Sequence, residues 1–396
     1  MKKVIVFLVF FSSCVPRNNQ VQHSEVITEL PYIISLEKEI DNIQKTGLSE
    51  IRSTITYIPL ETNSKSLLGD IINLKLTDSH IAVYDRHRQL LLYDSLGHYI
   101  RRISGLGRGP GEYSLGIHDF CFSPDGQKIY LVVDGKRCFE YDLDNHLLST
   151  YKLDFDCSQF LSLNDSSLIF YFLSSYPEIN PSLGIYDLNF NIRKSYPNYF
   201  QQNERHKGGR SRWITLYSYQ GNIRFREFRV DTLYTVTEKE LIPYSIITLG
   251  KKEVPIEYEV TFPTTHADIE RAIDRMANRY RHYQDMEDVD NIYFTLFGPQ
   301  NEEYLRGYFN KSNNTVRIIG SQFQNDIDGG LPFFPKYIYN DSILVDWVEA
   351  FDLREYVLSG NATEMRRLYG QKYDDLVKLA KSLHDESNPV LVMVKR

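Results

Sequence analysis

The part of the sequence whose residue types best suit chemistry is the glycine-rich string Leu106-Gly107-Arg108-Gly109-Pro110-Gly111-Glu112-Tyr113. Glycines allow positive φ angles and a close approach of the backbone, so successive N–H groups in such a loop can form an anion-binding nest, to which Arg108 adds charge. A tight connection between two sheets explains the same residues, with Arg108 and Glu112 paired to neighbours and Tyr113 packed. The Gly-Lys-Ser/Thr order of a phosphate-binding P-loop is absent, and strands follow rather than a helix.

A second candidate binding segment is the basic stretch of residues 205–213, which contains Arg210 and Arg212 and ends at Trp213. Its cationic side chains can contact an anionic glycan or a lipid headgroup, and the amphipathic indole ring of Trp213 can stack on a sugar. A solvated loop that precedes a buried tryptophan is the alternative. Residues 84–88, Tyr-Asp-Arg-His-Arg, are interpreted as a turn between strands.

Acidic residues gather at two places, namely Asp285, Glu287, Asp288 and Asp290, and Asp326 with Asp328. Alternating carboxylates can bind Ca²⁺, but neither group has the spacing of an EF-hand loop, and both are interpreted as solvated loops. The ten histidines form no His-Glu-x-x-His pattern. We therefore expect no metal site and no cofactor. A Gly-x-Ser-x-Gly nucleophile elbow is also absent from the sequence.

The elements that must position these residues are short strands. From about residue 51, apolar-alternating runs are separated by Gly, Asp, Asn and Ser turns, and aromatic residues make up 13% of the chain. A strand–turn–strand unit recurs around five aromatic residues, with intervals of 48, 45, 48 and 75 residues: Tyr93, Tyr141, Tyr186, Tyr234 and Phe309. A period of roughly 40 to 50 residues with four strands is typical of a β-propeller blade.

Two helical insertions explain the departures from this period. Residues 263–285 carry apolar residues at helical spacing, and their removal restores an interval of about 47 residues. A sixth unit at residues 336–348 is followed by a second insertion at residues 361–385, with Asn361 as its N-cap and a break at Gly370. The last unit then has three strands and ends at residues 390–394. We expect the strand at residues 55–60 to complete it, because closure between the termini removes two exposed sheet edges. The predicted fold is an all-β, six-bladed β-propeller with terminal strand closure.

The N-terminus predicts export. Lys2 and Lys3 precede an apolar run from Val4 to Phe11, which is too short to span a bilayer, and small residues follow it. The small residues end at Cys14, an arrangement that resembles a bacterial lipobox and implies cleavage before Cys14 and lipidation of this cysteine. Residues 1–13 are then the signal peptide, residues 14–24 a tether, and residues 25–396 the propeller. An ordinary signal peptide with an incidental cysteine is the alternative.

Three segments together resemble one family: the glycine-rich string, the strand at residues 57–62 and the terminal Asn388-Pro389-Val390-Leu391. They resemble the six-bladed β-propeller lipoproteins of Bacteroidota, a domain of unknown function related to NHL- and TolB-like propellers. The resemblance covers about residues 25 to 396. It implies an exported, lipid-anchored propeller, and it implies no particular reaction, ligand or catalytic residue.

Charge and cysteine content limit the partners. The net charge of −7 gives no general attraction to phosphate backbones, so nucleic acid is not an expected partner. Three cysteines remain beside Cys14, and buried free thiols are expected for them, with one disulfide as the alternative: Cys121, Cys138 and Cys157.

We expect a cell-envelope lipoprotein that contacts the membrane through Cys14 and binds an unknown protein or glycan. A binding role is favoured over an enzymatic one. The alternatives are a glycan lyase or hydrolase with its site at the channel mouth, and a structural subunit of an outer-membrane assembly. Residues 15–19 lack the acidic residues that resemble a surface-export signal, which favours the periplasmic side of the outer membrane over the cell surface.

Overall fold

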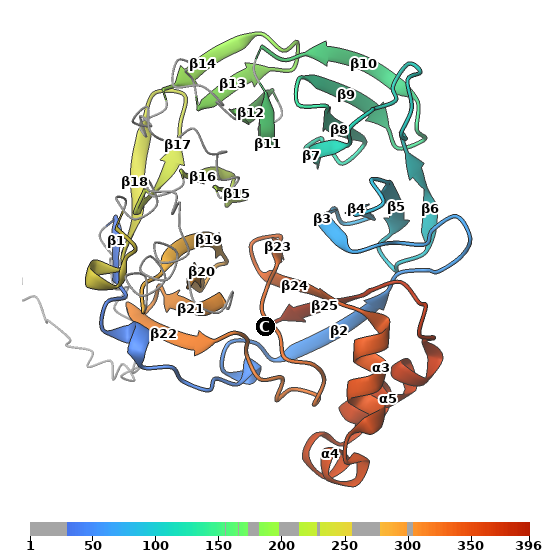
Figure 1. The fold of residues 1–396 in the computed structure, drawn as a ribbon, viewed down its shortest axis with the longest axis vertical. Helices are drawn as coiled ribbons and strands as arrows, with labels where there is room; N and C mark the ends of the chain where they lie inside the picture. Colours follow the sequence, from blue (N-terminus) through green and yellow to red (C-terminus); the bar gives the residue numbers. More distant parts are fainter. Residues whose placement is uncertain are drawn as a thin grey trace, which may run out of the picture.

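The structure is a computed structural model that describes residues 30–154, 156–164, 166–172, 182–197, 214–227, 230–255, 278–298 and 304–396. Within these ranges the strands form six sheets that are arranged as blades around a central axis (Figure 1). The innermost strands of neighbouring blades contact one another from blade 1 through to blade 6. The chain is therefore a six-bladed β-propeller, as the repeats predict.

Blades 1 to 3 follow the chain in order, from the innermost strand outward. Blade 1 contains β3 (Ile71–Leu76), β4 (His80–Asp85), β5 (Leu90–Asp94) and β6 (Tyr99–Ile103). Blade 2 contains β7 (Ile117–Phe122), β8 (Lys128–Val133), β9 (Arg137–Asp142) and β10 (Leu147–Lys152). Blade 3 contains β11 (Cys157–Asn164), β12 (Ser167–Phe172), β13 (Leu183–Asp187) and β14 (Ile192–Tyr196).

Blades 4 to 6 complete the ring. Blade 4 contains β15 (Thr215–Tyr219), β16 (Asn222–Arg226), β17 (Thr232–Val236) and β18 (Leu241–Thr248). Blade 5 contains β19 (Arg281–Glu287), β20 (Asn291–Phe297), β21 (Tyr304–Asn310) and β22 (Thr315–Gly320). Blade 6 contains β23 (Tyr337–Tyr339), β24 (Ile343–Val348), β25 (Val390–Lys395) and, as its outer strand, β2 (Thr54–Pro59).

The ends of the propeller are joined in blade 6, as predicted. Strand β2 pairs with β25 in antiparallel register, from Thr54 opposite Lys395 to Pro59 opposite Val390. Strand β25 also pairs with β24 and is thus the third strand of this blade, covered on both edges (Figure 1). The closure removes two open sheet edges and connects the first described blade strand to the last.

One strand has no counterpart in the sequence prediction. Strand β1 (Tyr32–Ser35) pairs in parallel with the end of β18 and adds a fifth strand to the outer edge of blade 4. The following residues contain the 3₁₀ turns η1 (Glu39–Asp41) and η2 (Leu48–Glu50), and bridges at Ile43–Ile318 and Gly47–Gln324 hold them against blade 5. Another 3₁₀ turn, η3 (Gly250–Lys252), follows β18. The segment before β2 therefore covers the outside of two blades.

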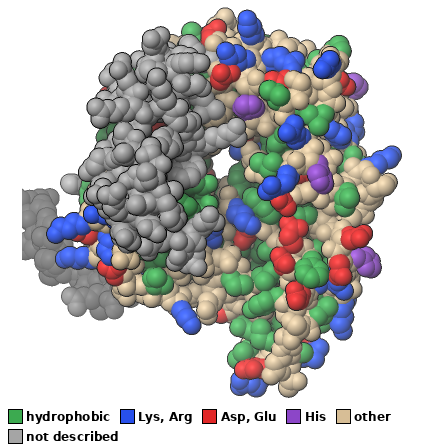
Figure 2. Space-filling model, in the orientation of Figure 1, with side chains coloured by type: hydrophobic (Ala, Val, Ile, Leu, Met, Phe, Trp, Pro, Cys, Tyr) green, Lys and Arg blue, Asp and Glu red, His purple; other side chains and the backbone are tan. Residues whose placement is uncertain are grey.

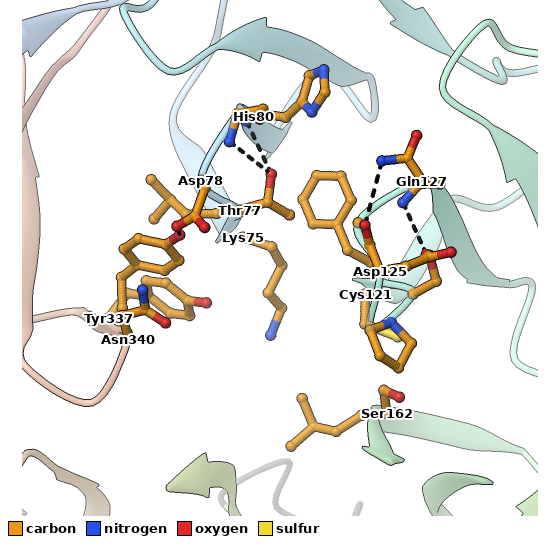
Figure 3. A pocket seen from close by; sticks show the side chains of 18 residues that line it. Lys75, Thr77, Asp78, His80, Cys121, Asp125, Gln127, Ser162, Tyr337 and Asn340 are labelled. Atoms are coloured by element: carbon orange, nitrogen blue, oxygen red, sulfur yellow. Dashed lines mark hydrogen bonds between the residues drawn. The ribbon is translucent and has the colours of Figure 1, made fainter. Parts of the chain in front are cut away.

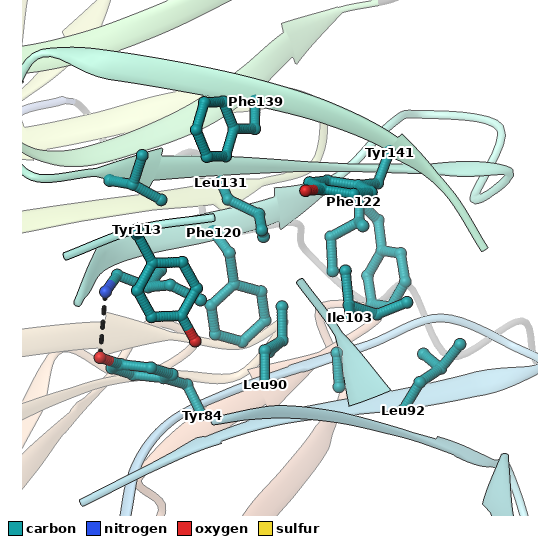
Figure 4. Close-up of a cluster of buried hydrophobic side chains, with 14 residues drawn as sticks. Tyr84, Leu90, Leu92, Ile103, Tyr113, Phe120, Phe122, Leu131, Phe139 and Tyr141 are labelled. Atoms are coloured by element: carbon teal, nitrogen blue, oxygen red, sulfur yellow. Dashed lines mark hydrogen bonds between the residues drawn. The ribbon is translucent and has the colours of Figure 1, made fainter. Parts of the chain in front are cut away.

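Buried apolar side chains fill the space between blades. The cluster between blades 1 and 2 is built around Phe120, Leu131 and Phe139, and it also receives Tyr113 from the connection between the blades (Figure 4). Cys121, Cys138 and Cys157 are buried free thiols, as expected, and burial raises the pKa of each thiol.

The C-terminal insertion lies outside the ring between β24 and β25 (Figure 1). It contains α3 (Ala350–Ser359), α4 (Ala362–Tyr369) and α5 (Gln371–Ser382). The predicted cap is confirmed, because the side chain of Asn361 accepts a hydrogen bond from the N–H of Glu364 at 3.3 Å. The break at Gly370 is also confirmed, with φ at 56°. The prediction that the insertion starts at residue 361 is wrong by one helix, since α3 begins directly after β24.

The other predicted insertion, at residues 263–285, falls mainly on residues 256–277, which lie outside the described residues. Its predicted end is wrong, because Arg281–Glu287 form strand β19 and pair with β20 from Arg281 to Glu287, with one bulge at Tyr283. Tyr280 and Tyr283 share a helical spacing by coincidence, and pairing in the innermost strand of a blade overrides it. No helix within the described ranges is long and apolar enough to cross a membrane.

Candidate functional site: the central channel

The innermost strands of four blades share a β-bulge near their start. The pairing register with the next strand shifts by one residue in β3, β7, β11 and β19. A bulge leaves one residue unpaired and re-aims its side chain. The four extra residues all line the central cavity of the ring: Ile72, His118, Ser158 and Tyr283. The repeated bulge is thus the local feature that turns these side chains towards the channel.

Two cavities occupy the channel. The larger has a volume of about 830 Å³ and is bordered by the turn after β4 and by the end of the β6–β7 connection. The smaller has a volume of about 490 Å³ and is bordered by the β3–β4 and β7–β8 turns, which lie at the other ends of these strands. Lys75, Leu161 and Tyr337 line both cavities and therefore mark their junction. Figure 2 shows the opening at the centre of the ring.

Lys75 is placed at this junction by the alternation of β3, in which Leu74 and Leu76 face the buried side. Its side chain extends into the smaller cavity, and Nζ faces the open space between Tyr337 and Ser162 (Figure 3). Among the described residues the Lys75 ammonium makes no hydrogen bond, and it makes no ion pair within 4.0 Å. Burial lowers the pKa of Lys75, but the nearby Asp119 carboxylate and Tyr337 outweigh burial, so its pKa is raised overall. Lys75 is therefore a cation at neutral pH.

The carboxylate of Asp119 is fully engaged by neighbouring strands. One oxygen accepts hydrogen bonds from Asn73 Nδ2 at 2.8 Å and from the N–H of Phe120 at 2.9 Å, and the other accepts from the N–H of Phe160 at 2.9 Å. Asp119 thus links the inner strands of blades 1, 2 and 3. Burial raises the pKa of this carboxyl group more than its neighbours lower it. Asp119 therefore stabilises the inner strands that line the channel, and it makes no direct ion pair with the Lys75 ammonium.

Several uncharged groups of the larger cavity are also uncommitted. The Ser158 hydroxyl has no hydrogen-bond partner although the residue is only 8% exposed. The side-chain amides of Gln159 and Gln284 line the same cavity and make no hydrogen bond within the described part of the chain. An amide can donate and accept at once, and a buried hydroxyl without a partner is energetically unfavourable. These groups are available to a polar ligand.

Three members of the first acidic cluster, Asp285, Glu287 and Asp288, are buried, so their interpretation as a solvated loop is wrong, whereas Asp290 is partly exposed and pairs with Arg396. Asp285 and Glu287 lie on β19, and their cationic partners lie in blades 4 and 5. Asp285 is two residues after the bulge, a position that the apolar residues Leu74 and Phe120 hold in β3 and β7. The physical reason is that buried cations face these carboxylates from β16 and from the β21–β22 turn. Without those partners the charges would remain in water.

Each carboxylate of this cluster has a named partner. Asp285 pairs with Arg226 at 2.7 Å and accepts a hydrogen bond from His282. Glu287 pairs with Lys311 at 2.5 Å and with Arg224 at 3.4 Å. The next residue in the chain, Asp288, pairs with Arg52, which lies just before β2.

Asp328 is buried as well and accepts hydrogen bonds from Asn325 at 2.7 Å and from the N–H of Gly330 at 3.0 Å, whereas Asp326 accepts from the N–H of Ser49 at 2.8 Å. In the part of the chain that the structure describes, no group of His, Cys, Asp and Glu is arranged to hold a metal ion.

The glycine-rich string forms the connection between β6 and β7, and the N–H groups of two of its glycines donate to the string itself. The N–H of Gly107 donates to the carbonyl of Tyr113 at 3.0 Å, and the N–H of Gly109 donates to Oε2 of Glu112 at 2.7 Å. This geometry favours a tight connection over an open anion-binding nest. Arg108 is exposed on it, Tyr113 is buried, and neither they nor Glu112 line the two cavities.

The other predicted site residues, Arg210, Arg212, Trp213 and Cys14, lie outside the described residues. Lys75, Gln159 and Ser158 were not identified from the sequence. Only Lys75 carries a readable signal there, because it and Asn73 alternate with apolar residues in Ile71-Ile72-Asn73-Leu74-Lys75-Leu76. That alternation indicates a polar face on a strand that is otherwise apolar.

Comparisons with known proteins agree with this architecture. A family model described as "Domain of unknown function (DUF4934)" matches residues 31–395. A crystal structure of a "putative exported protein" from Bacteroides fragilis is similar over 92% of this chain and 99% of its own, with 15% identity and a TM-score of 0.70.

Two further propeller structures are less similar. The WD40 domain of Doa1 has 9% identity and a TM-score of 0.34 over 63% of this chain and 62% of its own. The Cps50 (Swd1) domain of Myceliophteria thermophila has 10% identity and a TM-score of 0.37 over 69% of this chain and 91% of its own. No functionally curated protein matches the sequence.

Proposed function

The chain belongs to the DUF4934 family, a family defined by a domain of unknown function, and from that premise we propose that it is an exported propeller that binds a small polar ligand in its central channel. The observation that carries the proposal is the larger cavity of about 830 Å³, which lies where four inner strands turn their bulge residues inward. Ligand sites in proteins are typically concave cavities of roughly 300 to 1,000 Å³ with a few uncommitted polar groups. Ser158, Gln159 and Gln284 supply such groups here.

Binding is favoured over glycoside hydrolysis by the state of the carboxylates. A glycosidase needs two carboxyl groups that are free to transfer a proton or attack the sugar. The three carboxylates that line the larger cavity within the described ranges, Asp119, Asp285 and Glu287, are held by backbone amides or by buried cations. They are committed to the structure of the ring.

The experiment is a thermal-shift screen of glycans and metabolites on the purified full chain, compared with a variant that blocks the channel. Leu161→Trp places an indole at the junction of the two cavities, and Leu148→Trp is the matched control on the exposed outer strand of blade 2, where Leu148 is 46% exposed. We expect compounds that raise the melting temperature of the wild-type chain to do the same for Leu148→Trp and to have no effect on Leu161→Trp. Hits that bind Leu161→Trp equally well would place the ligand elsewhere and contradict the proposal.

We also propose that the chain is anchored in the cell envelope through a lipid on Cys14, on the periplasmic side of the outer membrane. The N-terminal leader ending at Cys14 supports this, as does the fold shared with a Bacteroides fragilis protein described as exported. Metabolic labelling with a radioactive fatty acid should mark the wild-type chain and leave Cys14→Ser unlabelled. Proteinase added to intact cells should leave the chain uncut, and digestion without lysis would contradict the periplasmic position.

A further inference from the structure

We propose that the ligand of the channel is a hydroxylated carboxylate whose carboxyl group pairs with Lys75 at the junction of the two cavities. This inference rests on the channel-binding function proposed above and adds the chemical class of the ligand. It is carried by three observations: the charge of the channel lining, the engagement of Asp119, and the position of uncharged hydrogen-bonding groups near Lys75.

In the described lining of the larger cavity, the charges that no ion pair balances have a positive excess. Of its four Lys and Arg side chains, Arg86 pairs with Asp70 at 2.6 Å and Lys336 pairs with Asp346 at 2.7 Å. The remaining two, Lys75 and Arg88, have no ion pair among the described residues.

The carboxylates of the lining are all engaged. Asp119, Asp285 and Glu287 are held as described above. In the smaller cavity, Asp78 accepts from the Tyr339 hydroxyl, and Asp125 accepts from the Ser123 hydroxyl at 2.5 Å. A hydrogen bond from a hydroxyl leaves the negative charge of Asp78 and Asp125 in place beside the smaller cavity. In the larger cavity the described side chains without an ion pair are the cations Lys75 and Arg88 and the carboxylate Asp119, so the excess charge there is positive, which suits an anionic ligand.

Asp119 does not substitute for that anion. Its negative charge helps to keep Lys75 protonated by electrostatic attraction, but its oxygens already accept three hydrogen bonds, from Asn73, Phe120 and Phe160. The Lys75 ammonium keeps its donors and faces open space in the cavity (Figure 3). A carboxylate that enters from the larger cavity can accept a charge-assisted hydrogen bond from this ammonium, which is stronger than a bond between neutral groups.

The groups near the junction specify more than charge. Gln159 lies two residues before Leu161 on β11, and Ser158 is the bulge residue of the same strand. Their amide and hydroxyl can donate and accept, so they suit ligand hydroxyl groups. The Tyr337 ring, whose centroid is 6.0 Å from Lys75 Nζ, offers an apolar face beside the cation. A carboxylate on a hydroxylated carbon frame fits this set of partners.

The test compares three acids with neutral counterparts of the same carbon frame: D-glucuronate with D-glucose, D-galacturonate with D-galactose, and D-gluconate with D-sorbitol. Binding to the purified full chain is measured by calorimetry and thermal shift at low ionic strength. We expect at least one acid to bind at least about tenfold more tightly than its neutral counterpart, which corresponds to one charge-assisted hydrogen bond. That preference should weaken as salt is added.

Three variants locate the preference. Lys75→Met should bind the acid and its neutral counterpart equally, whereas Lys75→Arg should keep the preference because the charge remains. Lys152→Met, on the exposed end of β10, removes a charge away from the channel and should leave binding unchanged. Melting curves that match the wild type show that each variant is folded. If Lys75→Met does not fold, Lys75→Arg alone tests whether the charge at this position gives the preference for the acid.

The outcomes separate the two proposals. Equal binding of acids and neutral counterparts by the wild type, a preference that survives in Lys75→Met, or no binding of any of the three acids overturns the inference. Neutral ligands that bind the wild type and are lost in Leu161→Trp would then leave the channel function standing. Acid binding that persists in Leu161→Trp contradicts both proposals, because that ligand does not use the channel.

Discussion

The phenolic hydroxyl of Tyr113 donates a hydrogen bond of 2.6 Å to the backbone carbonyl of Arg88. Tyr113 belongs to the glycine-rich connection between blades 1 and 2, and Arg88 belongs to the β4–β5 turn that borders the larger cavity. Arg88 has a φ of 60°, which is uncommon for a residue with a side chain. Through this bond, the glycine-rich connection stabilises the strained β4–β5 turn at the mouth of the channel. Burial raises the pKa of Tyr113 to about 12, so the hydroxyl stays protonated and donates.

Replacement of Tyr113 with phenylalanine tests this bond. The ring stays in the core between the blades, but the Arg88 carbonyl loses its donor, so the free energy of unfolding should fall by about 1 to 2 kcal/mol. Tyr356→Phe is the control, because Tyr356 is 43% exposed on α3 and should change stability by less than about 0.5 kcal/mol. Urea denaturation measures both. Equal effects of the two substitutions would show that the bond does not stabilise the fold.

Two glycines of the same string should differ in their tolerance of alanine. At Gly111, φ is 78° and an added Cβ would lie 2.3 Å from the Tyr141 hydroxyl oxygen, so both the backbone and a buried ring oppose it. At Gly107 the added Cβ would meet only the end of the Glu112 side chain, which can move. We expect Gly111→Ala to lower the unfolding free energy by about 1 to 3 kcal/mol and Gly107→Ala by less than about 1 kcal/mol. Thermal and urea unfolding of the two variants would reveal a reversed order, which would contradict this view of the connection.

The sequence predicts the ring because a blade is a local, repeated pattern. Strand–turn–strand units around residues such as Tyr93 and Tyr141 repeat at a nearly constant interval. The unpaired strand at residues 55–60 can then complete only the last blade, which has three strands of its own. Strand β1 escaped prediction because it is short and its pairing with β18 joins residues about 200 positions apart, beyond any local pattern.

The channel was harder to predict because its residues are scattered. Lys75, Ser158 and Gln284 come from three different blades, and only the ring brings them together. The acidic run at residues 285–288 was misjudged for the same reason, because its cationic partners Arg224 and Arg226 lie about 60 residues earlier in the chain. A local sequence pattern shows a charge and does not show the partner that allows it to be buried.

The ionic interface between blades 4 and 5 should be sensitive to the loss of one partner. Arg226→Met leaves the Asp285 carboxylate buried without its ion pair, so the free energy of unfolding should fall by about 3 to 5 kcal/mol. The control is Arg317→Met, whose pair with Glu50 is on the surface and should contribute less than about 1 kcal/mol. A loss at Arg226 as small as that at Arg317 in urea denaturation would show that the buried pair is not needed.

The same interface should make stability fall on mild acidification. Burial and the nearby Arg226 lower the pKa of His282 below its value of about 6.5 in an unfolded chain. Between about pH 6.5 and the lower folded pKa, the unfolded state binds a proton that the folded state resists, so stability decreases as the pH falls, by at most about 1.4 kcal/mol per pH unit. His282→Gln, which keeps a side-chain donor for Asp285, should flatten the dependence measured by urea denaturation between pH 7 and pH 5. An unchanged slope in this variant would remove His282 as the cause.

Closure of the ring through blade 6 should make the whole propeller depend on β25. Leu391 is fully buried and lies between Ile58 of β2 and Trp347 of β24, so Leu391→Ala leaves a cavity where the first and last described blade strands meet. The expected loss is about 2 to 5 kcal/mol, against less than about 0.5 kcal/mol for Leu96→Ala, since Leu96 is 70% exposed. Because a closed ring has no free edge from which blades can separate one by one, hydrogen exchange in blade 3 should accelerate along with that in blade 6. Faster exchange confined to blades 6 and 1 would show that the blades unfold independently and that the closure does not couple the ring.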